Sequence, residues 1–290
     1  MRTDIEELLP DRLKRLWLDV DAQRLTEQEF QIEQTRGLGA YREIWAEALR
    51  LKGRGALRKS LLWEIGAYVG CQDLTEVERR AKLAMEAARD EWHEHVKPDD
   101  PAAVERYYDT TDTALYELMW WHTLSWDESP LAYVTALQFA QQQGCQTCLD
   151  FGSGVGSGAI LLQSHDISVT LADISSPLLR FCAWRLSLRG LPVEQVDLKE
   201  EALPEEGFDL ILAMDVFEHL YDPVSAVAQL SASLRPGGFL FGRFGVEDTE
   251  DQPQHIVHDF AETLEAMTKN GLAPVWQDQW LWGHQAFRKM

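Results

Sequence analysis

The sequence predicts an α/β protein in which a doubly wound, mostly parallel seven-stranded sheet follows an all-helical N-terminal domain. Apolar residues recur three or four positions apart up to about residue 127, a spacing typical of helices. From Leu131 onwards, short apolar strands alternate with helices, which requires right-handed crossovers and a parallel sheet. A chain of 290 residues can form two domains, and we place them at residues 1–126 and 127–290.

The N-terminal region has the pattern of amphipathic helices that turn one apolar face to a core. Gly37-Leu38-Gly39 breaks the first two helices apart, Asp73 is the expected cap of the fourth, and Pro98 and Pro101 follow its end. The expected helices cover residues 8–20, 41–49, 56–69, 73–96 and 102–124. We expect this domain to cover a substrate or to mediate dimerisation, so that a homodimer is a possible assembly.

The second region predicts strands at 148–151, 169–173, 193–196, 208–214 and 239–244, followed by extended segments at 274–282 and 285–288. Helices are expected at 177–189, 223–234 and 260–269, and a turn at Arg235-Pro236-Gly237-Gly238. The last two strands have no helix between them, which predicts an antiparallel hairpin at one edge of the sheet.

Composition and charge exclude several classes of function. The net charge is −21, which disfavours a nucleic-acid partner because a polyanion must be neutralised by Lys and Arg. No apolar run approaches the roughly 20 residues of a membrane span, and the N-terminus has no apolar signal region. Four cysteines do not indicate a disulfide framework. We therefore expect a cytoplasmic protein that has neither a membrane nor a nucleic acid as partner.

The strongest local signal is the run LDFGSGVGSG at residues 149–158, which lies between a strand and a helix. Its glycines let the backbone turn sharply and approach a ligand, and the helix N-terminus offers free N–H groups. Asp173 ends the second strand about 20 residues later and can accept the two hydroxyls of a ribose. Asp150 would repel a pyrophosphate but suits an ammonium group. The residues therefore indicate a cofactor that contains a nucleoside.

At this point the sequence resembles the class I S-adenosylmethionine-dependent methyltransferases, of Rossmann-like fold and small-molecule type, over about residues 131–290. The resemblance is carried in order by LDFGSGVGSG, VTLADIS, VEQVDL, FDLILAMDVFEHLYDP and LRPGGFLFGRF. It implies that S-adenosylmethionine is the cofactor and that the enzyme is a methyltransferase. The cofactor-binding residues that it implies are Asp150, Gly152, Ser153, Gly154, Gly156, Asp173, Ile174, Asp197, Leu198 and Asp215.

Other residues resemble the acceptor-side features of small-molecule and fatty-acyl methyltransferases. The expected catalytic residues are His122, His219 and His255, and the expected substrate-binding residues are Tyr108, Trp121, Ser125 and Arg243. The set Asp215, Glu218 and His219 also looks like ubiquinone-pathway O-methyltransferases, for which a divalent cation is proposed. Because many relatives carry the Glu-His pair without a metal, we expect no metal here.

We therefore expect methyl transfer by in-line displacement to the oxygen or nitrogen of a small-molecule acceptor. Methylation of a protein or peptide side chain, with the helical domain recognising the partner, is a second hypothesis. A third is a methyltransferase-like scaffold or cofactor sensor without turnover, because fold alone does not fix function. The acceptor atom, the number of methyl groups and the oligomeric state stay open.

Overall fold

The computed structural model describes residues 8, 15–16, 18–20, 22–97, 100–125, 128–245, 252–277 and 283–290. Two expected segments, the helix at 8–20 and the extended segment at 274–282, lie partly outside these residues, as does the boundary proposed at 126/127. Among the described residues, no helix is both long and apolar enough to cross a lipid bilayer.

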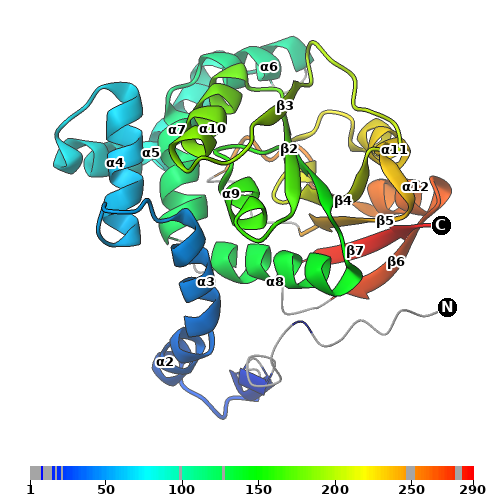
Figure 1. Cartoon of the computed structure of the whole chain (residues 1–290), viewed down its shortest axis with the longest axis horizontal. Coiled ribbons are helices and arrows are strands. Elements are labelled where there is room, and N and C mark those ends of the chain that lie inside the picture. Colours follow the sequence, from blue (N-terminus) through cyan, green and yellow to red (C-terminus); the bar gives the residue numbers. More distant parts are fainter. Residues whose placement is uncertain are drawn as a thin grey trace.

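The described residues contain a seven-stranded, mostly parallel sheet, as predicted (Figure 1). Its strands are β1 (Thr147–Phe151), β2 (Ser168–Asp173), β3 (Glu194–Asp197), β4 (Phe208–Ala213), β5 (Leu234–Arg243), β6 (Leu272–Gln277) and β7 (His284–Lys289). The order is β3-β2-β1-β4-β5-β7-β6. Only β7 runs antiparallel to its neighbours, and the expected hairpin of β6 and β7 lies at one edge. The order reverses between β1 and β4, where open α/β sheets bind ligands.

Helices cover both faces of the sheet, and the alternation of strand β4 shows how. Leu210 and Leu212 join a core with helix α8 (Glu128–Gln143) and helix α9 (Ser157–Gln163). Ile211 and Ala213 point to the opposite face, where helices α11 (Pro223–Ser233) and α12 (Ala261–Lys269) pack. Helix α10 (Ser176–Leu188) contributes Leu179, Cys182 and Leu186 to the first core. Both faces are therefore buried, as a parallel sheet requires.

The helical N-terminal region agrees with prediction in most elements. It comprises α2 (Glu27–Gly37), α3 (Gly39–Leu49), α4 (Leu57–Val69), α5 (Leu74–His95), α6 (Pro101–Thr110), α7 (Thr113–Trp120) and a π-helical turn, η1 (Trp121–Ser125). Asp73 caps α5 by accepting from the Thr75 N–H, and Leu38 separates α2 from α3. Helix α2 has no counterpart among the expected helices.

Two local predictions were wrong, each because of a contact distant in sequence. The stretch 102–124 is not one helix but breaks between α6 and α7, where the hydroxyls of Thr111 and Thr113 donate to Glu91 at 2.6 and 2.5 Å. The expected turn at 235–238 is part of β5 instead. There Phe208 pairs with Leu234 and Leu210 with Phe239, so that the intervening residues bulge out of the register.

The N-terminal helices pack directly on the sheet region. Leu61 and Ile65 of α4 share a buried cluster with Val155 and Phe181, and Trp45 of α3 belongs to the core below α8 and α9. Two of the buried clusters draw residues from both sides of the 126/127 boundary. The division into two domains at that boundary stays a prediction.

A buried ion-pair network, which we call the Glu64 network, joins α4 to α10. The Glu64 carboxylate accepts from Arg185 Nε at 2.9 Å and from Arg189 Nη2 at 2.8 Å. Glu64 and Arg185 are completely buried. Arg185 Nη1 also donates to the carbonyl oxygen of Val155 and, at 3.1 Å, to Ser157 Oγ. The network therefore ties the helical region to the loop that follows β1.

Candidate functional site

The glycine-rich loop leaves the carboxyl end of β1 and leads into helix α9. Gly152, Gly154 and Gly156 all have left-handed backbones, with φ of 69°, 50° and 72°. Only glycine adopts this region without a Cβ penalty, which explains three glycines at alternate positions. The N–H groups of Gly152 and Ser153 donate to the carbonyl oxygen of Ala172, which fixes the loop against the end of β2.

Asp173 ends β2 and lies against this loop. Its Oδ2 accepts from the Gly154 N–H and its Oδ1 from the Ser175 N–H, both at 2.9 Å. Burial raises the pKa of Asp173 to about 6, although these two N–H groups act to lower it. Each oxygen retains a further lone pair, so that the carboxylate can accept from two neighbouring ligand hydroxyls.

Asp173→Asn is expected to flatten the pH dependence of the stability of the ligand-free protein between pH 4 and pH 7.5. The folded-state pKa of Asp173 lies above the unfolded value of about 3.9, so its ionisation disfavours folding, and stability falls as pH rises between those values. Asparagine does not ionise, but its NH2 group cannot accept one of the two N–H groups that the carboxylate accepts, which lowers stability by a similar amount at every pH. The stability of the variant relative to wild type, measured by urea unfolding, should therefore rise from pH 4 to pH 7.5; a difference that is constant with pH would contradict the prediction.

A cavity of about 220 Å³ opens beside the loop, and most of the expected site residues line it. Those in its lining are Tyr108, Trp121, His122, Gly152, Ser153, Gly154, Asp173, Ile174, Leu198, Asp215, His219, Arg243 and His255. The strand ends thus form one wall, and residues 107–123 of the helical region contribute to another.

Four expected residues lie outside the lining. Asp150 is buried under the first turn of α9, and burial followed by the charge of Asp173 raises its pKa to about 7. Asp197 accepts from the Ser176 hydroxyl at 2.5 Å and from the Lys199 N–H at 3.1 Å. A Cβ on Gly156 would point at Cys182 Sγ, 2.9 Å away, and Ser125 is exposed at the end of η1. Asp150 is therefore buried below the loop, whereas Asp197 is half-buried at the end of β3 and lies outside the lining.

Asp215 and Arg243 form an ion pair on the cavity wall, with 2.7 Å between Oδ1 and Nη1. Asp215 has a left-handed backbone, φ 53°, which Asp tolerates better than most residues. Burial alone would raise its pKa, but Arg243, followed by His122 and His284, holds the pKa of Asp215 at about 2. The guanidinium expected to bind a substrate carboxylate thus already faces a carboxylate of the chain.

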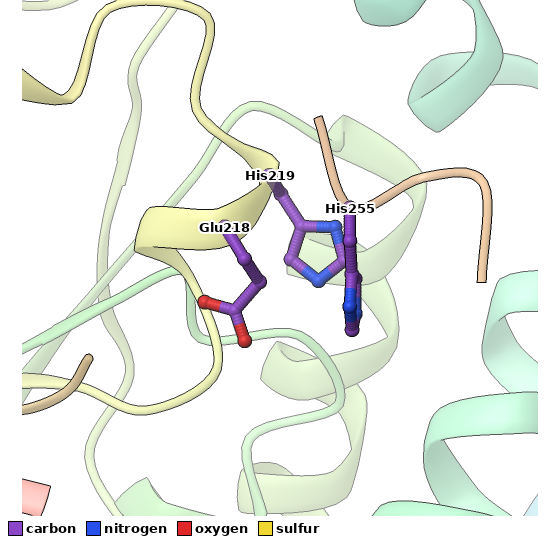
Figure 2. A group of neighbouring side chains, drawn as sticks. All are labelled: Glu218, His219 and His255. Atoms are coloured by element: carbon purple, nitrogen blue, oxygen red, sulfur yellow. The ribbon is translucent and has the colours of Figure 1, made fainter. Parts of the chain in front are cut away.

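Figure 2 shows a second cluster, formed by Glu218, His219 and His255, in which the two rings lie close to each other and to the carboxylate. One ligand atom from each residue lies within 4.8 Å of the others, so the cluster has the donor types of a metal site. Arg243 Nη1 is 4.0 Å from Glu218 Oε1 and adds a positive charge beside it. The expected absence of a metal stays a prediction.

The rings of His219 and His255 meet edge to face, with 4.7 Å between their centroids. His219 Nδ1 is 3.0 Å from the carbonyl oxygen of Gln254, and since that oxygen only accepts, Nδ1 carries the hydrogen. The Tyr108 hydroxyl oxygen, 3.3 Å from Nδ1, can share it. Burial, followed by His219, lowers the pKa of His255 to about 3, which keeps that ring neutral.

Several lining residues are absent from the sequence prediction. They include Met85, Tyr107, Glu117, Tyr133, Gln254 and His284. Glu117 had a visible signal, since it is the single acid in the apolar run ALYELMWW at residues 114–121. The other side chains reach the cavity from distant elements, and no local pattern distinguishes them from core or surface residues.

The strand order, the glycine loop after β1 and the acid that ends β2 together define the class I S-adenosylmethionine-dependent methyltransferase fold. Residues 149–240 match the family model described as a methyltransferase domain, and the chain therefore carries a domain of this class.

Known relatives each match about a third of the chain. A ubiquinone biosynthesis O-methyltransferase from Paramagnetospirillum magneticum is 33% identical over 97 residues, which are 33% of this chain and 39% of that protein. An uncharacterized methyltransferase of Mycobacterium bovis is 32% identical over 97 residues, 33% of this chain and 49% of its own. The chain thus spans half or less of the length of these two relatives. Among solved structures, a putative sarcosine dimethylglycine methyltransferase from Galdieria sulphuraria matches with a TM-score of 0.45 and 17% identity, over 56% of this chain and 87% of that one.

Proposed function

We propose that this protein binds S-adenosylmethionine and catalyses transfer of its methyl group to an oxygen or nitrogen of a small-molecule acceptor. The observation that carries the proposal is the cavity, which joins the strand-end carboxylate of Asp173 to a wall of aromatic and histidine side chains. A site of methyl transfer needs these two halves, one for the nucleoside and one for the acceptor.

The residues present fit the cofactor. Gly152, Gly154 and Asp173 lie together at the ends of β1 and β2, and Asp173 retains acceptor capacity for both ribose hydroxyls. Ile174 and Leu198 supply apolar surface for an adenine ring. The described lining carries four carboxylates against one guanidinium, which favours a cation. When bound, the cofactor would supply a methyl group on a sulfonium, activated for in-line displacement.

Of the residue types in the cavity wall, histidine is the one most often used to accept a proton from an acceptor hydroxyl or ammonium. We infer that His219 does so through Nε2, because its Nδ1 hydrogen is held by Gln254. His122, with Nδ1 3.9 Å from Asp215 Oδ2, is a second proton acceptor at the same wall. Neutral His255 would orient His219 through their edge-to-face contact.

The lining supports a small acceptor rather than a polypeptide. Tyr107, Tyr108, Trp121, His122 and Thr123 cover the cavity from the helical side, where a peptide substrate would need an open groove. The name of one relative, an O-methyltransferase of ubiquinone biosynthesis, agrees with methyl transfer to a small molecule.

Asp173→Asn is expected to weaken S-adenosylhomocysteine binding by at least about 100-fold, because each of two ribose hydroxyls would lose a charged acceptor, at about 1.5–3 kcal/mol per hydrogen bond. Isothermal titration calorimetry at pH 7.5 measures the loss. Asp90→Asn is the matched control, since the Asp90 side chain is 77% exposed on α5.

The two Asp173→Asn predictions are to be tested on one sample, because a pH-dependent change of stability together with a loss of affinity would assign both effects to the charge of Asp173. A wild-type protein that gives no heat with S-adenosylhomocysteine, or an Asp173→Asn variant that keeps wild-type affinity, would overturn the proposed function.

A further inference from the structure

Glu117 is a carboxylate in the cavity wall that no part of the proposed chemistry uses. It lies on α7 and lines the cavity, although its helix neighbours Leu115, Tyr116 and Met119 are buried apolar or aromatic residues. Among the residues that the structure describes, no hydrogen-bond donor or cation contacts its carboxylate. Burying a carboxylate without a partner is costly, so the side chain is suited to a cation that the chain itself does not supply.

The neighbouring acid, Glu91, makes a useful contrast. Its two oxygens accept from the hydroxyls of Thr111 and Thr113 at 2.6 and 2.5 Å, and these bonds hold the break between α6 and α7. Glu91 is therefore a structural acid that is satisfied within the protein, whereas Glu117, which faces the cavity, has its acceptor sites available to a ligand.

Aromatic rings surround the Glu117 end of the cavity. Tyr107 and Tyr108 line it from α6 and contact each other edge to face at 5.3 Å, and Met85 lines it from α5. The charge of Glu117 acts on both tyrosines, raising their pKa values beyond the larger effect of burial. A carboxylate flanked by aromatic faces is a recurrent way of binding an alkylammonium group, by ion pairing and cation–π attraction together.

The charge balance of the wall also favours a cation. Arg243 is the one guanidinium among the described lining residues, and it is engaged by Asp215 at 2.7 Å. Burial, followed by Glu91, raises the pKa of Glu117 to about 7, so a bound cation would ionise it with release of a proton.

We propose that Glu117 is the binding residue for a protonated amino group held in this cavity. Two sources share this chemistry: an amine acceptor, and the amino group of the cofactor's methionyl part. The inference rests on the proposed function, because it takes the cavity to hold the cofactor and an acceptor. In either case the ammonium keeps its proton, and the carboxyl proton of Glu117 passes to the buffer.

Glu117→Gln separates the two sources when it is titrated with paired probes. S-adenosylhomocysteine and 5′-methylthioadenosine share the nucleoside, but only the first carries the amino group. If the cofactor is the source, the variant should lose at least about tenfold in affinity for S-adenosylhomocysteine and nothing for 5′-methylthioadenosine, since a hydrogen bond to a charged group contributes more than the free energy of a tenfold change.

If an acceptor is the source, the loss appears instead with phenethylamine and not with the uncharged phenethyl alcohol, each titrated with and without S-adenosylhomocysteine. Calorimetry at pH 7 in two buffers of different ionisation enthalpy should show proton release with the charged probe, and Glu117→Gln should reduce it. Glu86→Gln, exposed on α5, is the control and should behave as wild type.

A Glu117→Gln variant with wild-type affinity for both S-adenosylhomocysteine and phenethylamine would overturn the assignment. So would a wild-type protein that binds neither charged probe more tightly than its uncharged partner. Failure of the proposed function is distinct: the wild-type protein would bind neither nucleoside, while the phenethylamine titration without nucleoside would still decide the role of Glu117.

Discussion

Glu64→Gln is expected to lower the free energy of unfolding by about 3–5 kcal/mol, the usual cost of removing one partner from a buried ion pair. Glu64 is completely buried and faces two guanidiniums, Arg185 Nε at 2.9 Å and Arg189 Nη2 at 2.8 Å. Glutamine keeps the shape but leaves both cations without a compensating charge. Equilibrium urea unfolding, followed by circular dichroism, measures the change.

The matched control is Glu265→Gln on α12. Glu265 pairs with Lys269 at 2.8 Å, but their side chains are 63% and 67% exposed, so the expected loss is below about 0.5 kcal/mol. Equal losses in the two variants would contradict the assignment of the Glu64 network as a major source of stability.

The Glu64→Gln variant should also weaken binding of a ligand at the glycine loop. Arg185 donates to the Val155 carbonyl and to Ser157 Oγ, and Ser157 Oγ lies 2.9 Å from Thr123 Oγ1 of η1. The Thr123 carbonyl in turn accepts from Trp45 Nε1 at 2.9 Å. Through these contacts the network positions the loop and the π-helical turn of the cavity wall relative to each other.

The sheet could be predicted from sequence because its determinants are local. Runs such as FDLIL alternate or cluster apolar residues within a few positions, and each is followed by a polar or glycine-rich loop. The strand-end acids follow from the same pattern, so that Asp173 could be placed at the site before its partners were known. The predictions that were wrong depended on contacts distant in sequence. One example is the break after α6, where Thr111 and Thr113 donate to Glu91 of α5.

The acceptor side could be predicted only in part for a related reason. Tyr108, Trp121 and His122 were found by resemblance, but Glu117 is separated from Tyr108 by the break between the helices and so has no fixed spacing to it. A solvated position on a helix surface and a carboxylate that faces a cavity look alike in sequence. Only the packing of α5, α6 and α7 distinguishes them.

Gly152→Ala is expected to cost about 2–4 kcal/mol of folding free energy, as the sum of a left-handed backbone and an overpacked contact. Gly152 has φ 69°, and a Cβ there would lie 2.5 Å from Val216 Cγ2. Because the loop lines the cavity, any shift that relieves this contact should also weaken S-adenosylhomocysteine binding, and calorimetry on the folded fraction would show it.

Gly144→Ala separates the two contributions. Gly144 has nearly the same backbone, φ 70°, but a Cβ there meets nothing within 4 Å, so only the backbone cost of about 1–2 kcal/mol should appear. Val216→Ala in the Gly152→Ala background should recover part of the remaining loss, which a double-mutant cycle quantifies. If Gly152→Ala costs no more than Gly144→Ala, then close approach of Val216 is not what requires glycine at the start of the loop, and the backbone conformation alone explains it.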